Sequence, residues 1–179
     1  MYRTIKLFAL LFLFVSCAEA DEKKEIQNTT TNEINKSVPI LRKVVKFEEF
    51  QNHFLKDDNK LYVINYWATW CKPCVHELPH FIELNEEFKG EKFNMTFVSL
   101  DSKSNFEDKV IPFAASKKMN ADLLLLDEVK NMNEWIPKID KDWSGSIPAT
   151  AFYRNGQKLY FHEGELSKEE LKSIIENYN

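Results

Sequence analysis

Two cysteines three positions apart, Cys71 and Cys74, are the residues of this chain whose spacing points most directly to chemistry. They belong to the pentapeptide Trp-Cys-Lys-Pro-Cys, which follows the apolar run 61–67 and precedes an amphipathic stretch over 75–88. A helix that begins here directs unpaired backbone N–H groups and a partial positive charge at the first sulfur. Both favour the thiolate, which is the form that attacks disulfides. The pattern therefore predicts a dithiol that closes to a disulfide and reopens.

The two residues between the cysteines suit the start of a helix. Pro73 fits a first helical turn, where its missing N–H costs nothing, and Lys72 adds a nearby positive charge. A static structural disulfide is an alternative, but such bonds stabilise most when they close long loops, and this loop is nearly the shortest possible. A zinc site of four thiolates is excluded within one chain, because the sequence holds only three cysteines.

The segment directly downstream, from His76 to His80, has the H-E-x-x-H spacing of zinc proteases. That site needs a regular helix with both histidines on one face, and Pro79 between them interrupts such a helix. No third ligand is evident in the sequence. We therefore interpret His76 and His80 as solvated helix residues and predict that the protein has no metal site.

The N-terminus has the pattern of an export signal. Arg3 and Lys6 precede an apolar run over 7–15, which is too short to span a bilayer comfortably but suits the core of a signal peptide. We therefore predict a signal peptide over residues 1–16 and an extracytoplasmic, periplasmic location for the rest of the chain.

Ser16 and Cys17 follow that run directly, and a small residue before a cysteine at this place resembles a bacterial lipoprotein cleavage box. We expect Cys17 to carry a lipid that anchors the protein to a membrane. Residues 17–37 are polar and would form a flexible tether with a reach of roughly 25 Å, and the folded domain would span 38–179. Cleavage by the ordinary signal peptidase a few residues later, which would leave a soluble secreted protein, is the alternative.

The composition supports a folded core and limits the partners. Hydrophobic residues make up 44% of the 179 positions and aromatic residues 13%, which is too much apolar surface for a disordered chain. The net charge is −4 and no basic stripe is present, so we expect no nucleic-acid binding.

Strand-like and helix-like patterns alternate along the chain and predict an α/β domain. The end of the chain is the clearest part, because Asn155 and Gly156 mark a tight hairpin and the segment from Ser167 to Glu170 is a capping box that opens a last helix. The expected strands are 61–67, 93–100, 122–126, 149–154 and 157–162. The expected helices are 47–54, 73–88 with a kink at Pro79, 105–119 with a break or kink at Pro112, 129–136 and a C-terminal one after Ser167.

With Trp-Cys-x-Pro-Cys between a strand and a helix, the chain resembles the thioredoxin superfamily. Pro79 lies where thioredoxins carry a proline in the active-site helix, and the segment around Ile147 and Pro148 is similar to their cis-proline loop. The buried aspartate of thioredoxins would fall at Asn65. The spacing from Cys74 through Glu77 to the proline is instead similar to the C-x-x-E-x-P pattern of the TlpA/ResA group of membrane-tethered, extracytoplasmic thiol–disulfide oxidoreductases.

This resemblance implies the fold. It is a thioredoxin-like three-layer α/β/α sandwich with a mixed central sheet and a C-terminal β-hairpin and helix. The long stretch between Phe93 and Ile147 resembles the extra helix and strand that the TlpA group inserts into the thioredoxin core.

The resemblance also implies roles for the motif residues. Cys71 is the exposed nucleophile that forms a mixed disulfide, and the more buried Cys74 attacks it to release the reduced substrate. Glu77 lies one helical turn beyond Cys74, and we interpret it as the proton acceptor that replaces the carboxylate missing at Asn65. A solvated helix glutamate is the alternative for that position.

Three more residues are candidates for contact with substrate. Trp70 would shield the dithiol and offer a flat apolar surface. A cis peptide bond before Pro148 would turn the backbone of Ile147 outward, where its N–H and C=O could pair with an extended substrate strand.

The resulting hypothesis is a lipoprotein that reduces disulfides of exported proteins, as in cytochrome c maturation. It would receive electrons from a membrane donor of the thiol–disulfide type and need no cofactor beyond its own redox-active disulfide. The alternatives are an oxidant or isomerase of the same fold, or a thioredoxin-like lipoprotein that binds a partner without redox work. A peroxidase is disfavoured, because its reactive cysteine typically stands alone in its loop.

Overall fold

The computed structural model describes residues 40–178. The predicted signal peptide over 1–16, the lipid attachment at Cys17 and the tether over 17–37 lie outside the described residues. Among the helices within 40–178, none combines the length and the apolar composition that crossing a membrane requires.

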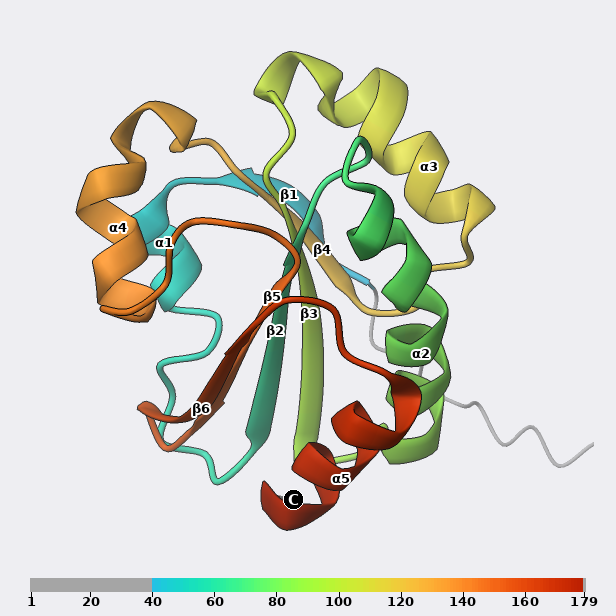
Figure 1. Cartoon of the computed structure of the whole chain (residues 1–179), viewed down its shortest axis with the longest axis vertical. Helices are drawn as coiled ribbons and strands as arrows, with labels where there is room; N and C mark the ends of the chain where they lie inside the picture. Colours follow the sequence, from blue (N-terminus) through green and yellow to red (C-terminus); the bar gives the residue numbers. More distant parts are fainter. Residues whose placement is uncertain (1–39, 179) are drawn as a thin grey trace, which may run out of the picture. The chain divides into compact units, whose positions relative to one another are not determined.

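A single mixed sheet of six strands forms the centre of the domain, in the order β1-β4-β3-β2-β5-β6 (Figure 1). The first four strands in this order run parallel to one another, whereas β5 lies antiparallel to both β2 and β6. The bounds are β1 (Arg42–Val45), β2 (Leu61–Trp67), β3 (Phe93–Ser99), β4 (Asp122–Leu126), β5 (Ala149–Arg154) and β6 (Gln157–Glu163).

Helices cover both faces of this sheet, so the expected three-layer sandwich is present (Figure 1). On one face lie α1 and α4, and on the other lie α2, α3 and α5. The helices are α1 (Phe47–Gln51), α2 (Lys72–Phe88), α3 (Ile111–Ser116), α4 (Met132–Ile139) and α5 (Lys168–Tyr178), with short 3₁₀ turns at Lys103–Asn105 and Val129–Asn131 and a π-helical turn at Phe106–Val110.

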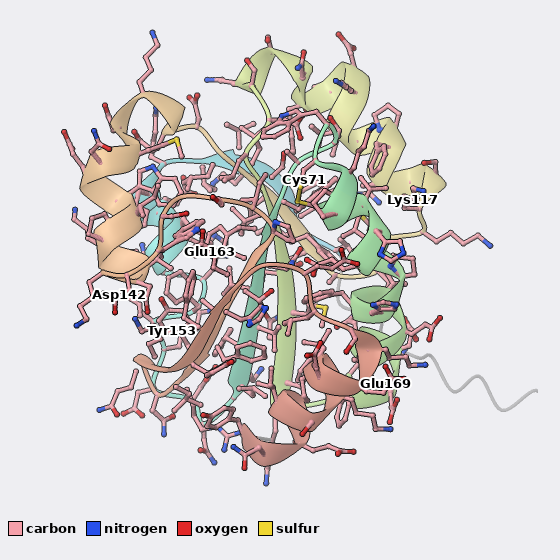
Figure 2. The ribbon with its side chains drawn as sticks, in the orientation of Figure 1. Cys71, Lys117, Asp142, Tyr153, Glu163 and Glu169 are labelled. Carbon is pink, nitrogen blue, oxygen red and sulfur yellow. A yellow bond between two sulfur atoms is a disulfide. The ribbon has the colours of Figure 1, made fainter. Side chains whose placement is uncertain are left out.

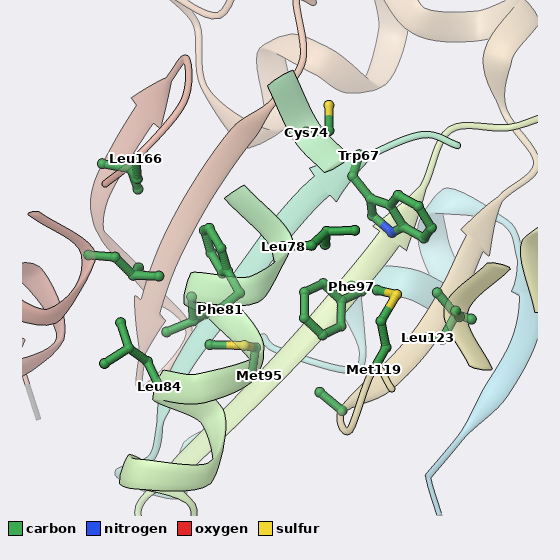
Figure 3. Packing of buried hydrophobic residues seen from close by; sticks show 14 of the residues in the cluster. Trp67, Cys74, Leu78, Phe81, Leu84, Met95, Phe97, Met119, Leu123 and Leu166 are labelled. Atoms are coloured by element: carbon green, nitrogen blue, oxygen red, sulfur yellow. The ribbon is translucent and has the colours of Figure 1, made fainter. Parts of the chain in front are cut away.

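Strand β2 is fully buried and serves both layers, because successive side chains of a strand point to opposite faces. Ile64 and Tyr66 pack among the residues of α1 and α4, whereas Val63 and Trp67 pack beneath α2. Figure 3 shows that second layer, in which Trp67 lies close to Leu78 and Phe97. The strand ends at the point where the chain enters the Cys71 loop, so a rigid central element positions the predicted dithiol.

The predicted elements agree with the structure where their signals are local. Strands β2, β4 and β5 have the expected bounds. The hairpin turn has Asn155 and Gly156 at positive φ, 49° and 70°. The capping box is present, with the Glu170 N–H donating to Ser167 Oγ and the Ser167 N–H donating to the Glu170 carboxylate.

Two regions differ in detail from the expected elements. The helix expected over 105–119, with a break or kink at Pro112, is a π turn at Phe106–Val110 followed by α3, and Pro112 lies in the first turn of α3, where its missing N–H is tolerated. Strand β1 was not expected at all. It is a short edge strand in which only Val45 is buried, so its sequence carries no alternating pattern.

Candidate active site

The two cysteines of the motif form a disulfide at the N-terminus of α2. Cys71 is the N-cap residue of the helix, and its Sγ accepts a hydrogen bond of 3.3 Å from the backbone N–H of Cys74. Pro73 occupies the first turn, as its missing N–H allows. The first sulfur therefore lies where the unpaired N–H groups of a helix favour negative charge. Figure 2 shows Cys71 at this end of α2.

The sulfurs are largely covered in this oxidised state. Cys71 keeps 5% of its surface exposed and Cys74 none, so Cys71 is the more accessible of the two but not the exposed residue that we expected. The neighbouring Trp70 is 63% exposed, and Lys72 and Pro73 are exposed as well. An exposed aromatic ring beside a nearly covered sulfur provides the flat apolar surface that the sequence predicted at this position.

A loop beside the disulfide brings a backbone carbonyl close to Cys71. The peptide bond between Ile147 and Pro148 is cis, as the resemblance implied, and the Ile147 carbonyl oxygen lies 3.6 Å from Cys71 Sγ. Pro148 is buried and Ile147 is partly exposed. The loop thus forms one wall of the site and leaves part of Ile147 available to a partner.

Glu163, at the end of β6, holds this loop and was not anticipated from the sequence (Figure 2). Its carboxylate accepts hydrogen bonds from the Ser144 N–H, at 2.9 Å, and from the Ser144 hydroxyl, which also contacts the Ser146 hydroxyl at 2.9 Å. These hydrogen bonds lower the pKa of Glu163. A second tie is the Trp143 indole N–H, which donates to the Ser146 carbonyl at 2.8 Å.

Asp101 fixes the opposite side of the site, where the chain approaches Cys71. It accepts hydrogen bonds from the Thr69 N–H at 2.9 Å, the Thr69 hydroxyl at 2.7 Å and the Ser99 hydroxyl at 2.9 Å. The topology of the sheet provides a sequence signal for this residue. Asp101 follows β3 and the Cys71 loop follows the parallel strand β2, so both must lie at the same edge of the sheet.

Glu77 is fully buried beneath the active-site helix, so it is not a solvated surface residue. Its Oε1 accepts a hydrogen bond of 2.8 Å from Asn65 Nδ2, and its Oε2 accepts one of 2.9 Å from the Leu166 backbone N–H. Asn65 Nδ2 also donates to the Thr150 hydroxyl oxygen at 3.2 Å. The carboxyl on α2 therefore contacts Asn65 directly, which is the position where the resemblance placed the thioredoxin aspartate.

Burial raises the pKa of Glu77 to about 7. The hydrogen bonds from Leu166 and Asn65 act in the opposite direction, because they stabilise the carboxylate, and the nearby charge of Glu165 raises the pKa further. A carboxyl group with such a pKa exchanges protons readily at neutral pH. Cys74 lies one turn earlier on the same helix face, so the site places a buried carboxyl group close along the helix to the second cysteine of the pair.

The histidines of the H-E-x-x-H segment do not converge on a common point. His76 is exposed and pairs with Glu165, whereas His80 Nδ1 lies 3.3 Å from the Leu166 carbonyl oxygen. Within residues 40–178, no three His, Cys, Asp or Glu side chains are grouped so that they could hold a metal ion.

The sheet order, the cysteine pair at the start of α2 and the cis-proline loop facing it define a thioredoxin-like protein. The chain belongs to the AhpC/TSA family, which matches it over residues 35–161.

Named relatives agree with that assignment. The thiol-disulfide oxidoreductase ResA of Oceanobacillus iheyensis is 37% identical over 124 residues, which are 66% of this chain and 57% of that protein. ResA of Bacillus cereus is 30% identical over 153 residues, which are 80% of this chain and 77% of the relative. The chain thus spans little more than half of the first relative's length and about three quarters of the second's.

Among solved structures, a thiol:disulfide interchange protein of the thioredoxin family from Chlorobium tepidum superposes with a TM-score of 0.56. The match covers 68% of this chain and 81% of that one, at 20% identity, and it supports the fold alone. Thiol–disulfide exchange uses the sulfurs themselves as the redox group, so this chemistry takes no bound cofactor.

Proposed function

We propose that the protein is a thiol–disulfide oxidoreductase that reduces disulfides of exported proteins through Cys71 and Cys74. The observation that carries this proposal is the disulfide at the N-terminus of α2, with the Ile147 carbonyl 3.6 Å from Cys71 Sγ and Glu77 buried one helical turn beyond Cys74. The names of the relatives from Oceanobacillus iheyensis and Bacillus cereus support the same chemistry.

The reaction begins with the reduced pair. The Cys71 thiolate attacks a substrate disulfide, forms a mixed disulfide with one substrate sulfur and releases the other as a thiolate. Cys74 then loses its proton and attacks Cys71 Sγ, which frees the second substrate sulfur. The substrate gains two electrons and ends as two thiols, while the pair loses two electrons and ends as the observed disulfide.

Glu77 is the proposed acceptor of the proton that Cys74 must lose. The carboxylate is buried on the same helix face as Cys74, and its pKa of about 7 lets it take a proton and return it at neutral pH. Trp70 offers an exposed apolar ring to the substrate, and the Ile147 backbone offers polar groups to an extended strand. Lys72 and the helix N-terminus favour the Cys71 thiolate.

The setting proposed for this reaction is outside the cytoplasm, where a lipid on Cys17 would hold the domain at a membrane. A disulfide reductase in that compartment lacks the cytosolic thiol buffer, so a membrane donor of the thiol–disulfide type would have to reduce it again. Apocytochrome c is one candidate among the exported substrates.

The reduction potential of the Cys71–Cys74 couple tests the direction of the reaction. We expect a value near that of thioredoxin, about −270 mV, after equilibration with dithiothreitol at neutral pH. A value near about −120 mV, which is typical of a strong oxidant such as DsbA, would overturn the reductase assignment in favour of an oxidant or isomerase.

A pair of cysteine variants tests whether the protein acts through redox chemistry at all. Cys71→Ser should abolish insulin disulfide reduction, whereas Cys74→Ser should accumulate a mixed disulfide on Cys71 because the resolving attack is lost. If a cell that depends on the protein behaved normally with Cys71→Ser, the protein would instead be a binding module that does not need its dithiol.

A further inference from the structure

The side chain of Asn65 carries a polar atom that its surroundings leave unpaired. Asn65 is fully buried, and its Nδ2 donates to both Glu77 Oε1 and Thr150 Oγ1. Its Oδ1 is buried without any hydrogen-bond donor in reach among the described residues. A buried oxygen left without a partner costs about 1–3 kcal/mol, so this arrangement calls for a physical reason.

The reason lies in which oxygen of Glu77 can hold a proton. Oε2 accepts from the Leu166 backbone N–H, a donor that cannot become an acceptor. A proton taken up by the carboxyl must therefore stay on Oε1, the oxygen that faces Asn65. In the orientation described above, that would bring an O–H donor against the Asn65 N–H₂ donor.

An amide can resolve this conflict by turning half a revolution about its last side-chain bond, because its oxygen and nitrogen occupy nearly equivalent positions. Oδ1 of Asn65 would then accept hydrogen bonds from the protonated Oε1 of Glu77 and from the rotatable hydroxyl of Thr150. With Glu77 ionised, Nδ2 is hydrogen-bonded and Oδ1 is not; with Glu77 protonated and the amide turned, Oδ1 would be hydrogen-bonded and Nδ2 would not. The unpaired atom is thus explained by an amide that can bind Glu77 in both protonation states.

We propose that Asn65 is a positioning residue that follows the proton on Glu77. Its amide donates to the carboxylate and turns to accept from the carboxylic acid, so Glu77 keeps its place below Cys74 in both states. This inference rests on the proposed function in one respect, namely that Glu77 changes protonation during the reaction. Neither an aspartate, which would repel the carboxylate, nor an aliphatic side chain could serve both states.

Other titratable groups near Glu77 come from two elements. The segment between β6 and α5 supplies Glu165, whose charge raises the pKa of Glu77. Helix α2 supplies His76, which pairs with Glu165, and His80, whose Nδ1 lies near the Leu166 carbonyl oxygen. Strands β2 and β5 face it with the neutral amide and hydroxyl described above. A measurement must therefore observe the Glu77 and Asn65 side chains directly rather than rely on the pH dependence of activity.

The deciding experiment follows both side chains by NMR in the isotope-labelled full chain. We expect the Asn65 side-chain N–H₂ resonances to shift with pH, with the same midpoint as the Glu77 carboxyl carbon. In the Glu77→Gln variant the Asn65 resonances should no longer shift near that midpoint. Asn65 resonances that stay constant while Glu77 titrates would overturn the inference, and this result needs no variant to fold.

A matched pair of variants measures the size of the effect. Asn65→Leu removes both hydrogen bonds of the amide to Glu77, and the bond to the charged carboxylate is the stronger of the two, so the Glu77 midpoint should rise by about one pH unit. Thr150→Val removes the other partner of the amide without touching the carboxyl, and it should shift the midpoint far less. An unchanged midpoint in Asn65→Leu, or an equal shift in Thr150→Val, would contradict a role for the amide.

The outcomes separate this inference from the proposed function. If Asn65 follows Glu77 but Glu77→Gln leaves the rate of Cys74 attack unchanged, then Glu77 is not the proton acceptor and the coupling between the two side chains still stands. If Glu77→Gln lowers the rate of Cys74 attack while the Asn65 resonances of the unmodified protein do not change as Glu77 titrates, the proposed function stands and the inference about Asn65 fails.

Discussion

The two faces of the central sheet bury different kinds of side chain against β2: aromatic ones on one face, and an amide and a carboxyl on the other. Towards α1 and α4, β2 presents Tyr66, whose ring lies within a cluster of aromatic side chains. Towards α2 it presents Asn65, which contacts the buried carboxyl of Glu77. Burial raises the pKa of Tyr66 well above its ordinary value, so that residue stays neutral, whereas Glu77 titrates near neutral pH.

The contrast shows how the domain keeps stability and reactivity apart. An aromatic layer contributes apolar burial and contains no group that changes charge near pH 7 among those described above. The layer beneath α2 contains a buried carboxyl, which is costly to bury, and in the proposed function its proton exchange serves the dithiol. Mutations on the first face should therefore change the free energy of unfolding, and mutations on the second should change pH dependence and redox behaviour.

The largest expected effect on stability comes from Phe50→Ala on the aromatic face. Phe50 is fully buried and its ring lies 4.9 Å from that of Phe54 and 6.1 Å from that of Tyr66. Truncation should cost about 3–5 kcal/mol in the free energy of unfolding, measured in urea, because it leaves a cavity. The reduction potential of the folded protein should stay unchanged.

The matched control for Phe50→Ala is Leu55→Ala nearby, where the side chain is 42% exposed. That variant should change stability by no more than about 0.5 kcal/mol. A clear shift of the Cys71–Cys74 potential in Phe50→Ala would show that the two faces are coupled and would break the comparison.

The next effect concerns pH on the reactive face. The pKa of Glu77 is raised from 4.5 to about 7 in the folded state, so folding is favoured most below pH 4.5 and that advantage is lost as the pH rises to about 7. The size is about 3 kcal/mol. Glu77→Gln should flatten this part of the curve of unfolding free energy against pH.

A mutation of Asp58 serves as the control for that curve. Asp58 lies in the loop before β2 and accepts a hydrogen bond from the Tyr62 hydroxyl, which lowers its pKa. Asp58→Asn should leave the slope between pH 4.5 and about 7 in place, because the pKa of Glu77 is untouched. An identical slope in Glu77→Gln and the unmodified protein would contradict the assignment of the slope to Glu77.

A smaller effect is expected where Glu163 holds the cis-proline loop. Glu163→Gln keeps the shape of the side chain but removes its charge, which weakens the hydrogen bonds from Ser144 by about 1 kcal/mol. Because the loop carries Ile147, we expect a several-fold higher KM for a protein disulfide and little change in kcat. Steady-state kinetics of insulin reduction would measure both, and a fall in kcat alone would contradict this role.

The sequence predicted the parts of the site whose signals are local. The Cys71 and Cys74 pair and the central strand before it depend on short-range patterns, and so does the hairpin that follows the cis-proline. The partners of Glu77 and Ser144 were not predictable in this way. Leu166 offers only a backbone N–H, 89 positions from Glu77, and Glu163 lies 19 positions from Ser144. Such contacts exist only once the helices have docked on the sheet.

The smallest expected effect tests how far the buried carboxyl depends on α5. Ser167→Ala removes the N-cap of that helix and should cost about 1 kcal/mol of stability, whereas Ser173→Ala, on the exposed face of the same helix, should be neutral or slightly stabilising. Leu166 precedes Ser167, and its side chain is buried independently of the cap. Its backbone N–H should therefore keep its hydrogen bond to Glu77 in both variants. The midpoint of the Glu77 titration should therefore stay the same in both variants. If Ser167→Ala moved that midpoint, the proton affinity of the reactive face would depend on helix capping, and the separation of stability from reactivity would not extend to α5.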